Sequence, residues 1–520
     1  MEYSHPKWLE NAVFYEIYPQ SFKDSDGDGI GDLNGITSKL DYIKDVGFNA
    51  IWLNPIFDSP FYDAGYDVTD YKKIAPRYGS LDDFKKLLKE AHKRGIKILL
   101  DLVPGHTSVY SKWFVKSCLD ETNKYSDRYI WTKGTWNITN EFAWLKGISQ
   151  RDGAVMTNFF SIQPALNYGF YEKKYDYEEE ITDKGPQSTI KAMIDVIDYW
   201  FEIGIDGFRV DMAGWLVKRD PDGIGTMKVW AQIFKNVKSK WPDKAFVSEW
   251  SQPLKSLACG FDMDFILQDS FAKYHTDLTR GENPYFSKKS KGNAAGFLNY
   301  HLNMFKKIVQ EKCSISIISG NHDTIRISET LKSEEELKMF YAFLYTFPGV
   351  PFMYYGDEIG MKYVHGLKSV EGGYQRTGSR SPMLWDDSKN AGFSTADEKK
   401  LYIAQDSDPK RETVKSQEKE PNSLLNFVKK MIQLRNNYTE LQTYSNIEYL
   451  YLKENDYPLI YIRKNDAGQI LVAINASKSK KEVTFDRLYS GNILLNYNNV
   501  KVKGNTLILP SQSVYVLKLN

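Results

Sequence analysis

The stretch IKAMIDVIDYWFEIGIDGFRVD, residues 190–211, contains the unit from which the fold can be inferred. Its first part, residues 190–203, repeats apolar side chains with the period of an amphipathic helix. After a short turn, residues 207–211 (GFRVD) form a brief run that predicts a buried strand ending in a carboxylate. A helix followed directly by a buried strand is the repeating unit of a parallel sheet covered by helices.

The same alternation runs through most of the 520 residues. Amphipathic runs at 81–94 and 334–347 are each long enough to return the chain to the start of another strand. Short apolar runs predict strands at residues 13–18, 50–53, 96–103, 207–211, 245–249, 261–265, 314–318 and 350–355. Eight strands joined by such crossovers predict an α/β fold, a closed (β/α)8 TIM barrel.

Two segments break this rhythm. One, between the third strand and the helix at 190–203, is polar, aromatic and irregular, and it is too long for a simple loop. The other follows a last helix at 424–435 and shows the period-two alternation of short antiparallel strands. We therefore expect the barrel in residues 1–104 and 181–440, a small inserted domain in 105–180, and a C-terminal antiparallel β-sandwich in 441–520.

Composition excludes several classes of partner. Lysine and arginine number 68 and aspartate and glutamate 67, so no net charge draws the chain to nucleic acid or an anionic membrane. No apolar stretch is long enough to span a membrane, and the N-terminus lacks a signal-peptide pattern. The three cysteines form no CxxC pair, which predicts neither a disulfide framework nor a zinc site. We expect a cytoplasmic protein, or a secreted one if a signal peptide has been removed; its oligomeric state stays open.

Polar residues gather where the predicted strands end. In a TIM barrel, the C-terminal ends of the strands carry the reactive groups, so these residues should meet at one mouth. A single Asp or His at a strand end is usually a turn residue, but a series of them is not explained in this way. They are Asp101 and His106 after the third strand, Arg209 and Asp211 on the fourth, Glu249 on the fifth, and Asn321, His322 and Asp323 after the seventh.

Two of these carboxylates suit opposite chemical roles. Arg209 and Asp211 share one face of their strand, and a neighbouring guanidinium is expected to lower the pKa of Asp211, as a nucleophile needs. Glu249 lies one unit later beside Trp250, a setting that suits a general acid. Such a pair is what glycoside cleavage requires, and a separation of about 5 to 5.5 Å would give retention of configuration.

The residues at these strand ends lie in motifs that resemble the α-amylase superfamily, glycoside hydrolase family 13, across essentially the whole chain. A further motif, RSPMLWD at 380–386, is similar to RTPMQWD of the oligo-1,6-glucosidase and α-glucosidase branch. The matching motifs are DLVPGH (101–106), QPALN (163–167), GFRVD (207–211), SEW (248–250), SGNHD (319–323) and PGVPFMYYGDEIGM (348–361).

This resemblance implies a role for each matching residue. Asp211 would be the nucleophile that forms a glucosyl ester, and Glu249 the acid/base. Tyr66 would stack on the bound glucose. Asp67 would bind the hydroxyls of its non-reducing end and pair with Arg380, which would close the pocket beyond one glucose. The remaining sugar contacts would come from Asp323, His106 and His322, with Arg209 orienting the nucleophile.

The segment DSDGDGIGD, residues 24–32, sets oxygen ligands at alternate positions around a glycine-rich turn. It resembles the calcium loop of the same branch, with Asp24, Asp26, Asp28 and Asp32 as carboxylate ligands and the Ile30 carbonyl completing the set. A turn of Asp and Gly without a metal is the alternative. No organic cofactor is expected.

These observations predict a retaining hydrolase that releases glucose from the non-reducing end of short malto- or isomalto-oligosaccharides. A transglucosidase or a trehalose-synthase-like isomerase is one alternative, an endo-acting amylase or neopullulanase-like enzyme is another, and a non-catalytic carbohydrate-related binding protein is a remote third. Gly214 and Trp215 replace the Lys-His pair that α-amylases use for leaving-group sugars, which argues against an endo-amylase. Met212 after the nucleophile leaves the choice between α-1,4 and α-1,6 linkages open.

Overall fold

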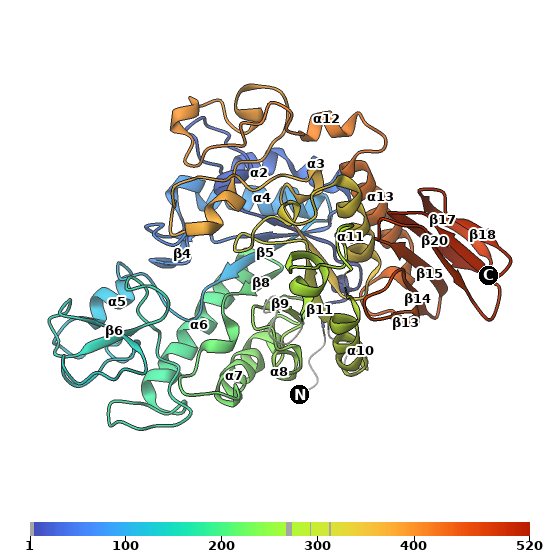
Figure 1. Cartoon of the computed structure of the whole chain (residues 1–520). Coiled ribbons are helices and arrows are strands. Elements are labelled where there is room, and N and C mark those ends of the chain that lie inside the picture. Colours follow the sequence, from blue (N-terminus) through green and yellow to red (C-terminus); the bar gives the residue numbers. More distant parts are fainter. Residues whose placement is uncertain (1–4, 267–272, 292, 311–313) are drawn as a thin grey trace.

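A closed barrel of eight parallel strands forms the centre of the molecule (Figure 1), which confirms the predicted fold class. The computed structural model describes residues 5–266, 273–291, 293–310 and 314–520, excepting the side chains of 305–310. Each predicted strand overlaps one strand of the barrel. In spatial order they are β1 (Phe14–Ile17), β12 (Val350–Tyr354), β11 (Ser314–Ile318), β10 (Met263–Phe265), β9 (Ala245–Ser248), β8 (Gly207–Val210), β5 (Lys97–Leu102) and β2 (Ala50–Leu53).

Helices surround the barrel. The predicted helix at 190–203 begins earlier, at Lys184, and ends at Ile203. Gly204, which caps it, takes the left-handed conformation (φ +113°) that glycine adopts at no steric cost. No helix in the described part of the chain is both long and apolar enough to cross a membrane. The α-helices around the barrel are α1 (Pro19–Phe22), α2 (Leu33–Ser38), α3 (Leu40–Val46), α4 (Leu81–Lys93), α6 (Lys184–Ile203), α7 (Ile224–Lys240), α8 (Pro253–Ala258), α10 (Ala295–Gln310), α11 (Glu334–Thr346), α12 (Val414–Glu418) and α13 (Leu424–Asn437).

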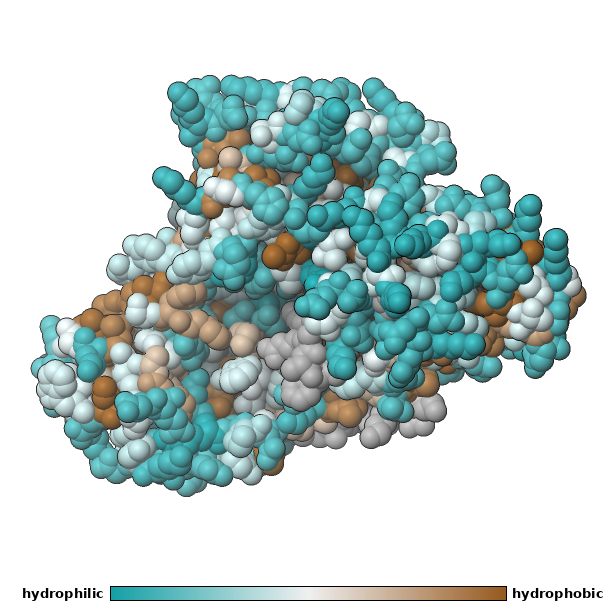
Figure 2. Space-filling view, viewed as in Figure 1, coloured by the Kyte–Doolittle hydropathy of each residue, from teal (hydrophilic) through white to brown (hydrophobic). Residues whose placement is uncertain are grey.

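The segment between β5 and α6 folds as a small inserted unit beside the mouth of the barrel (Figure 1). It contains α5 (Lys112–Ser117) and the antiparallel pair β6 (Ala143–Lys146) and β7 (Ala154–Thr157). A separate apolar cluster that includes Ile130 and Phe170 lies inside it. Hydrophobic side chains gather over this unit on the face shown in Figure 2. A second antiparallel pair, β3 (Phe57–Asp58) and β4 (Asp70–Ile74), precedes it in the chain.

The C-terminal strands form two antiparallel sheets with an apolar core between them. The first sheet is β13 (Asn446–Tyr451), β14 (Leu459–Asn465), β15 (Gly468–Asn475), β20 (Ser513–Leu519) and β17 (Gly491–Tyr497), and the second is β16 (Lys481–Thr484), β19 (Thr506–Leu509) and β18 (Lys501–Lys503).

Candidate active site

One buried guanidinium connects three carboxylates at the mouth of the barrel. Arg209 is fully buried, and its Nη1 atom lies 2.8 Å from Asp101 Oδ1 and 3.0 Å from Asp211 Oδ1. Its Nη2 atom lies 2.6 Å from Glu249 Oε2. The register explains this meeting, because Asp101 pairs with Arg209 across β5 and β8, and Glu249 directly follows the adjacent strand β9. The two carboxylates that the sequence singles out therefore lie side by side.

Ionisation of Asp211 differs from the sequence-based expectation. Burial raises the pKa of Asp211 well above its ordinary value, and the lowering by Arg209 is opposed by the negative charges of Glu249 and Asp101. The predicted low pKa of Asp211 is therefore wrong. The reason is that one guanidinium contacts several carboxylates, so its positive charge is too widely shared to lower the pKa of Asp211 against burial.

Asp264, a residue just inside the end of β10, holds residues on both sides of Glu249. Asp264 Oδ1 accepts hydrogen bonds from Ser248 Oγ (2.6 Å), Trp250 N (3.1 Å) and Ser251 N (3.3 Å). Ser251 has a φ of +59°, a strained value for a residue with a side chain, so the carboxylate stabilises a tight turn. Burial raises the pKa of Asp264 to about 7. Sequence reasoning missed this residue, although its strand-end position was a usable signal.

His322 and Asp323 form a second charged group at the mouth. His322 Nδ1 lies 2.9 Å from Glu16 Oε1, and its Nε2 lies 3.2 Å from Asp323 Oδ2. Burial lowers the pKa of His322, but the charges of Asp323 and Glu16 outweigh it and raise this pKa to about 9. The ring of Tyr66 stacks on His322 at 5.4 Å, and the Tyr66 hydroxyl lies 2.8 Å from His322 Nε2.

The predicted ion pair between Asp67 and Arg380 is not formed. Asp67 is fully buried, and its carboxylate accepts hydrogen bonds from Ser59 Oγ and from the amides of Tyr62 and Asp63. Arg380 instead donates to Asp323 Oδ1 at 3.0 Å and to a backbone carbonyl. The cause is local: Ala64 and Gly65 have positive φ angles, and the turn folds the Asp67 carboxylate under the preceding loop.

Arg376 is a second arginine at Asp323, and Asp63 is the carboxylate of the preceding loop that lies near it. Arg376 Nη1 lies 2.6 Å from Asp323 Oδ1, and its Nη2 lies 4.0 Å from Asp63 Oδ1. Asp63 also accepts a hydrogen bond of 2.7 Å from Gln163 Nε2. Both residues lie within four positions of a motif residue, Tyr66 or Arg380, but spacing alone did not reveal that Arg376 joins Arg380 at Asp323.

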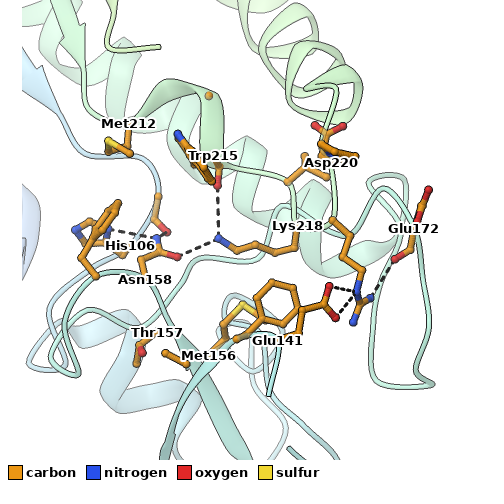
Figure 3. A pocket seen from close by; sticks show the side chains of 18 of the residues that line it. His106, Glu141, Met156, Thr157, Asn158, Glu172, Met212, Trp215, Lys218 and Asp220 are labelled. Carbon is orange, nitrogen blue, oxygen red and sulfur yellow. Dashed lines mark hydrogen bonds and ion pairs between the residues drawn. The ribbon is translucent and has the colours of Figure 1, made fainter. Parts of the chain in front are cut away.

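His106 links this mouth to a cavity of about 730 Å³ (Figure 3). Its Nε2 atom lies 3.1 Å from the Tyr66 carbonyl, and its Nδ1 lies 3.4 Å from Asn158 Nδ2. Burial lowers the pKa of His106 to about 4, so the imidazole is neutral at pH 7. The cavity is also lined by Met212, which directly follows Asp211. The cavity therefore adjoins the chain segment that follows Asp211.

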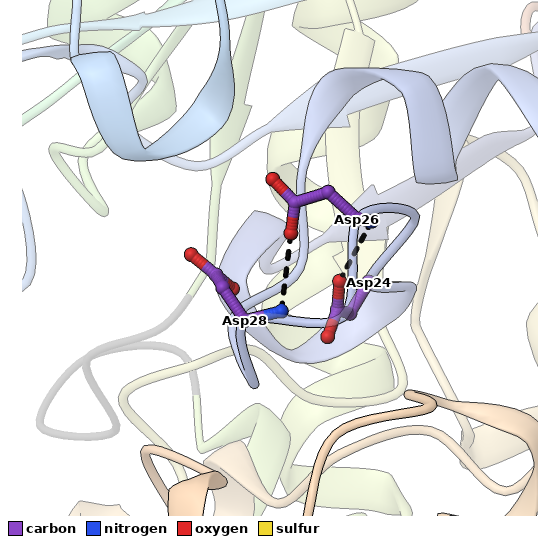
Figure 4. A group of neighbouring side chains, drawn as sticks. All are labelled: Asp24, Asp26 and Asp28. Carbon is purple, nitrogen blue, oxygen red and sulfur yellow. Dashed lines mark hydrogen bonds between the residues drawn. The ribbon is translucent and has the colours of Figure 1, made fainter.

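The predicted calcium loop brings three carboxylates together (Figure 4). Oxygen atoms of Asp24, Asp26 and Asp28 lie within 4.8 Å of one another. Burial raises the pKa of Asp26, and the charges of the other two add to the effect, so a cation would relieve their repulsion. Asp32 lies outside this group. Both its oxygens accept hydrogen bonds from Ser25, and one also accepts from the Gly35 amide and caps α2. These three side chains suit a hard cation.

Comparisons with known proteins agree with this geometry. Residues 16–444 match the family model described as "Alpha amylase, catalytic domain". The chain is 30% identical to alpha-amylase 3 of Dictyoglomus thermophilum, covering 99% of this chain and 95% of that protein, and 29% identical to oligo-1,6-glucosidase of Bacillus cereus, covering 95% of each. It is also similar to the crystal structure of a mutant isomaltulose synthase from Erwinia rhapontici NX5 in complex with sucrose, with a TM-score of 0.81, 25% identity and 99% of each chain covered.

Proposed function

This chain belongs to the alpha-amylase family of glycoside hydrolases, and from that premise we propose that it is a retaining α-glucosidase that releases glucose from the non-reducing end of short α-glucosides. The observation that carries the proposal is the shared guanidinium of Arg209. It contacts the carboxylate of Asp211 through Nη1 and that of Glu249 through Nη2, which supports a double displacement in which these two carboxylates act as a pair.

In this mechanism Asp211 attacks the anomeric carbon, and Glu249 protonates the oxygen that leaves. The resulting glucosyl ester on Asp211 is then hydrolysed by a water molecule that Glu249 deprotonates. Arg209 orients both carboxylates, since it contacts each of them. Its charge also stabilises the ionised form of Asp211, which the attack consumes.

The charged group around His322 is proposed to bind the glucose. Asp323 and His322 would bind its hydroxyls, His106 would contact the same ring, and Tyr66 would stack against it. Asp63 and Arg376, rather than Asp67 and Arg380, would restrict cleavage to the non-reducing end. Arg376 contacts Asp323 and lies 4.0 Å from Asp63, at the outer limit of an ion pair, and in this proposal the two residues limit the pocket to one glucose.

We also propose a structural calcium ion in the loop of residues 24–32. Asp24, Asp26 and Asp28 would hold it, and the Ile30 carbonyl stays a proposed ligand. Asp32 supports the loop differently, by capping α2. The ion would stabilise the loop and take no part in the cleavage.

A second candidate is an isomerase or transglucosidase that passes the glucosyl group to a sugar instead of water. The similarity to a solved isomaltulose synthase, over nearly the full length of both chains, favours keeping it. The two candidates share the glucosyl ester and differ only in which acceptor attacks it, so product analysis separates them.

The test is a time course of products from maltotriose, isomaltotriose, maltose and sucrose, with Asp211→Asn as the blank. A hydrolase releases free glucose from one or both trisaccharides, and the preferred trisaccharide gives the linkage. An isomerase converts maltose or sucrose into an isomeric disaccharide with little free glucose. Normal turnover by Asp211→Asn would refute the assigned nucleophile.

A further inference from the structure

A mostly buried ion pair joins two loops that reach the mouth of the barrel. Arg77 Nη1 lies 2.6 Å from Glu371 Oε1, and the two side chains are only 16% and 14% exposed. Arg77 follows β4 in the chain, and Glu371 lies in the segment between β12 and α12. In the described part of the chain, the side-chain contacts of this pair do not include Asp211, Glu249 or Asp323. The proposed reaction gives the pair no part, so its burial needs another explanation.

Arg77 also contacts the loop that carries Asp63. Its guanidinium carbon lies 4.0 Å from the centre of the Phe61 ring, two residues before Asp63. A cation over an aromatic face is attracted by the electrons of the ring, and the attraction is stronger where water is excluded. Gln20, just after β1, approaches the other oxygen of Glu371, with its Nε2 atom 3.3 Å from Oε2. The Glu371 carboxylate is thus held by two side chains that are far from it in the sequence.

The backbone at Glu371 packs closely on the same loop. Glu371 and Gly372 have φ angles of +48° and +65°, and the first of these is a left-handed value that a residue with a side chain rarely adopts. A Cβ atom on Gly372 would lie 2.7 Å from the Tyr62 carbonyl oxygen, so only glycine allows this approach without a shift of the backbone. The contacts of the Glu371 side chain therefore hold a strained turn in place.

This turn fixes the direction of Arg376. Arg376 Nη2 donates to the Gly372 carbonyl at 2.8 Å, and its Nε donates to the Gly373 carbonyl at 3.3 Å. The remaining Nη1 atom donates to Asp323 Oδ1 at 2.6 Å. Because the guanidinium group is planar and rigid, the two carbonyls determine where Nη1 points. A chain of contacts therefore runs from Glu371 through the turn to the carboxylate that is proposed to bind the glucose.

We propose that Arg77 and Glu371 form a positioning pair, which sets the affinity for the sugar. The pair holds Arg376 against Asp323 through the turn that follows Glu371. The inference rests on the proposed function, because it assumes that Asp323 binds the glucose. Loss of either partner leaves the other charge buried without compensation, so the turn should move. The two catalytic carboxylates keep their contacts with Arg209, so the pair should affect sugar binding more than the chemical step.

The test measures KM and kcat of Glu371→Gln on p-nitrophenyl α-glucoside. We expect KM to rise about tenfold, the scale of one weakened hydrogen bond between charged groups, while kcat changes less than about threefold. Arg77→Gln should give the same change, and the double variant should cost no more than either single one, because both substitutions remove one interaction. Arg77→Lys keeps a cation within reach of Glu371 and should recover most of the affinity. As the matched control, Glu90→Gln breaks a 3.0 Å ion pair with Arg94 at the end of α4 and should change neither constant.

Two further variants show whether the pair acts through Arg376. In an Arg376→Gln background, Glu371→Gln should raise KM no further, because the contact that the pair positions is already absent. Gly372→Ala leaves the ion pair intact but forces the turn away from Tyr62, so it should raise KM as Glu371→Gln does. This variant also provides the test if Glu371→Gln does not fold.

A KM within about twofold of the wild-type value in both Glu371→Gln and Gly372→Ala would overturn the inference. Losses in Glu371→Gln and Arg376→Gln that add in the double variant would also overturn it, since a residue that acts through another cannot add to its loss. A wild-type protein that releases no p-nitrophenol would instead count against the proposed function, so the two failures are distinguishable.

Discussion

At the scale of single residues, the number of cations in contact with each carboxylate decides the direction of its pKa shift. Arg209 contacts Asp101, Asp211 and Glu249, and burial of the group outweighs the guanidinium in setting the pKa of Asp211. Asp323 is the opposite case. Burial raises its pKa, but His322, Arg380 and Arg376 together hold the pKa of Asp323 well below its ordinary value. The pKa values of these two carboxylates, which lie at one mouth, are therefore shifted in opposite directions.

The raised pKa of Asp211 predicts an unusual acid limb in the pH profile. A nucleophile reacts only when ionised, so kcat/KM for p-nitrophenyl α-glucoside should fall as the pH drops through a value above the ordinary Asp pKa of about 3.9. Glu249→Gln removes a negative charge that raises this pKa, so its acid limb should move to lower pH. An acid limb at an ordinary Asp pKa that Glu249→Gln leaves unmoved would contradict this picture.

His322 predicts a loss of stability at alkaline pH. Its folded-state pKa of about 9 lies above the unfolded value of about 6.5, so its contribution is complete below pH 6.5 and disappears as the pH rises through 9. The shift corresponds to about 3 kcal/mol. Denaturant unfolding between pH 6 and 10 measures it, and Glu16→Gln, which removes one charge that raises the pKa, should flatten the dependence. Identical profiles for the two proteins would exclude His322 as the source.

At the scale of elements, short turns decide which side chains reach the mouth. The positive φ angles of Ala64 and Gly65 direct Asp67 under its own loop and leave Asp63 near Arg376. The turn after β9 works similarly, since Asp264 holds the amides of Trp250 and Ser251 around Glu249. The strands fix where each side chain is attached to the barrel, and these turns decide which way the side chain points.

The loop of residues 24–32 predicts a stabilising effect of calcium. Asp24 already joins this loop to a distant one through Ser394 Oγ at 2.5 Å. Calcium at a hundred times its Kd should stabilise the folded state by about 2.7 kcal/mol, so EDTA should lower the Tm. Asp26→Asn should abolish the response to calcium while leaving kcat at temperatures below the Tm unchanged. A Tm that is insensitive to EDTA in the wild-type protein would rule out the ion.

At the scale of the whole molecule, two buried arginines join the barrel to the C-terminal sheets. Arg463 on β14 donates to the carbonyls of Thr346 and Leu441, and also to those of Gln442 and Ser445. Arg435 on α13 donates to other carbonyls of the same junction, including Gly349 O. Burial lowers the pKa of each of these guanidinium groups to about 9. Both groups satisfy carbonyls that would otherwise be buried without partners.

This junction predicts a large cost for losing one arginine. Arg463→Met removes the side-chain donor of the Thr346 and Ser445 carbonyls, and each unpaired buried group costs about 1–3 kcal/mol, so the protein should be destabilised by about 2–6 kcal/mol. The exposed Arg487 is the control, and Arg487→Met should change stability by less than about 0.5 kcal/mol. Denaturation followed by tryptophan fluorescence compares them. Equal midpoints for the two variants would show that the junction contributes little.

Local pattern in the sequence determined the barrel and the residues at its mouth. Helical and strand periods depend only on neighbours in the chain, which is why all eight strands were predicted and why Asp211, Glu249 and Asp323 could be selected from strand ends. Tertiary structure alone decided the rest. Contacts between segments far apart in the chain decide which carboxylate faces Arg376 and how Arg209 is shared. Burial, which sets the pKa values, exists only after those segments pack.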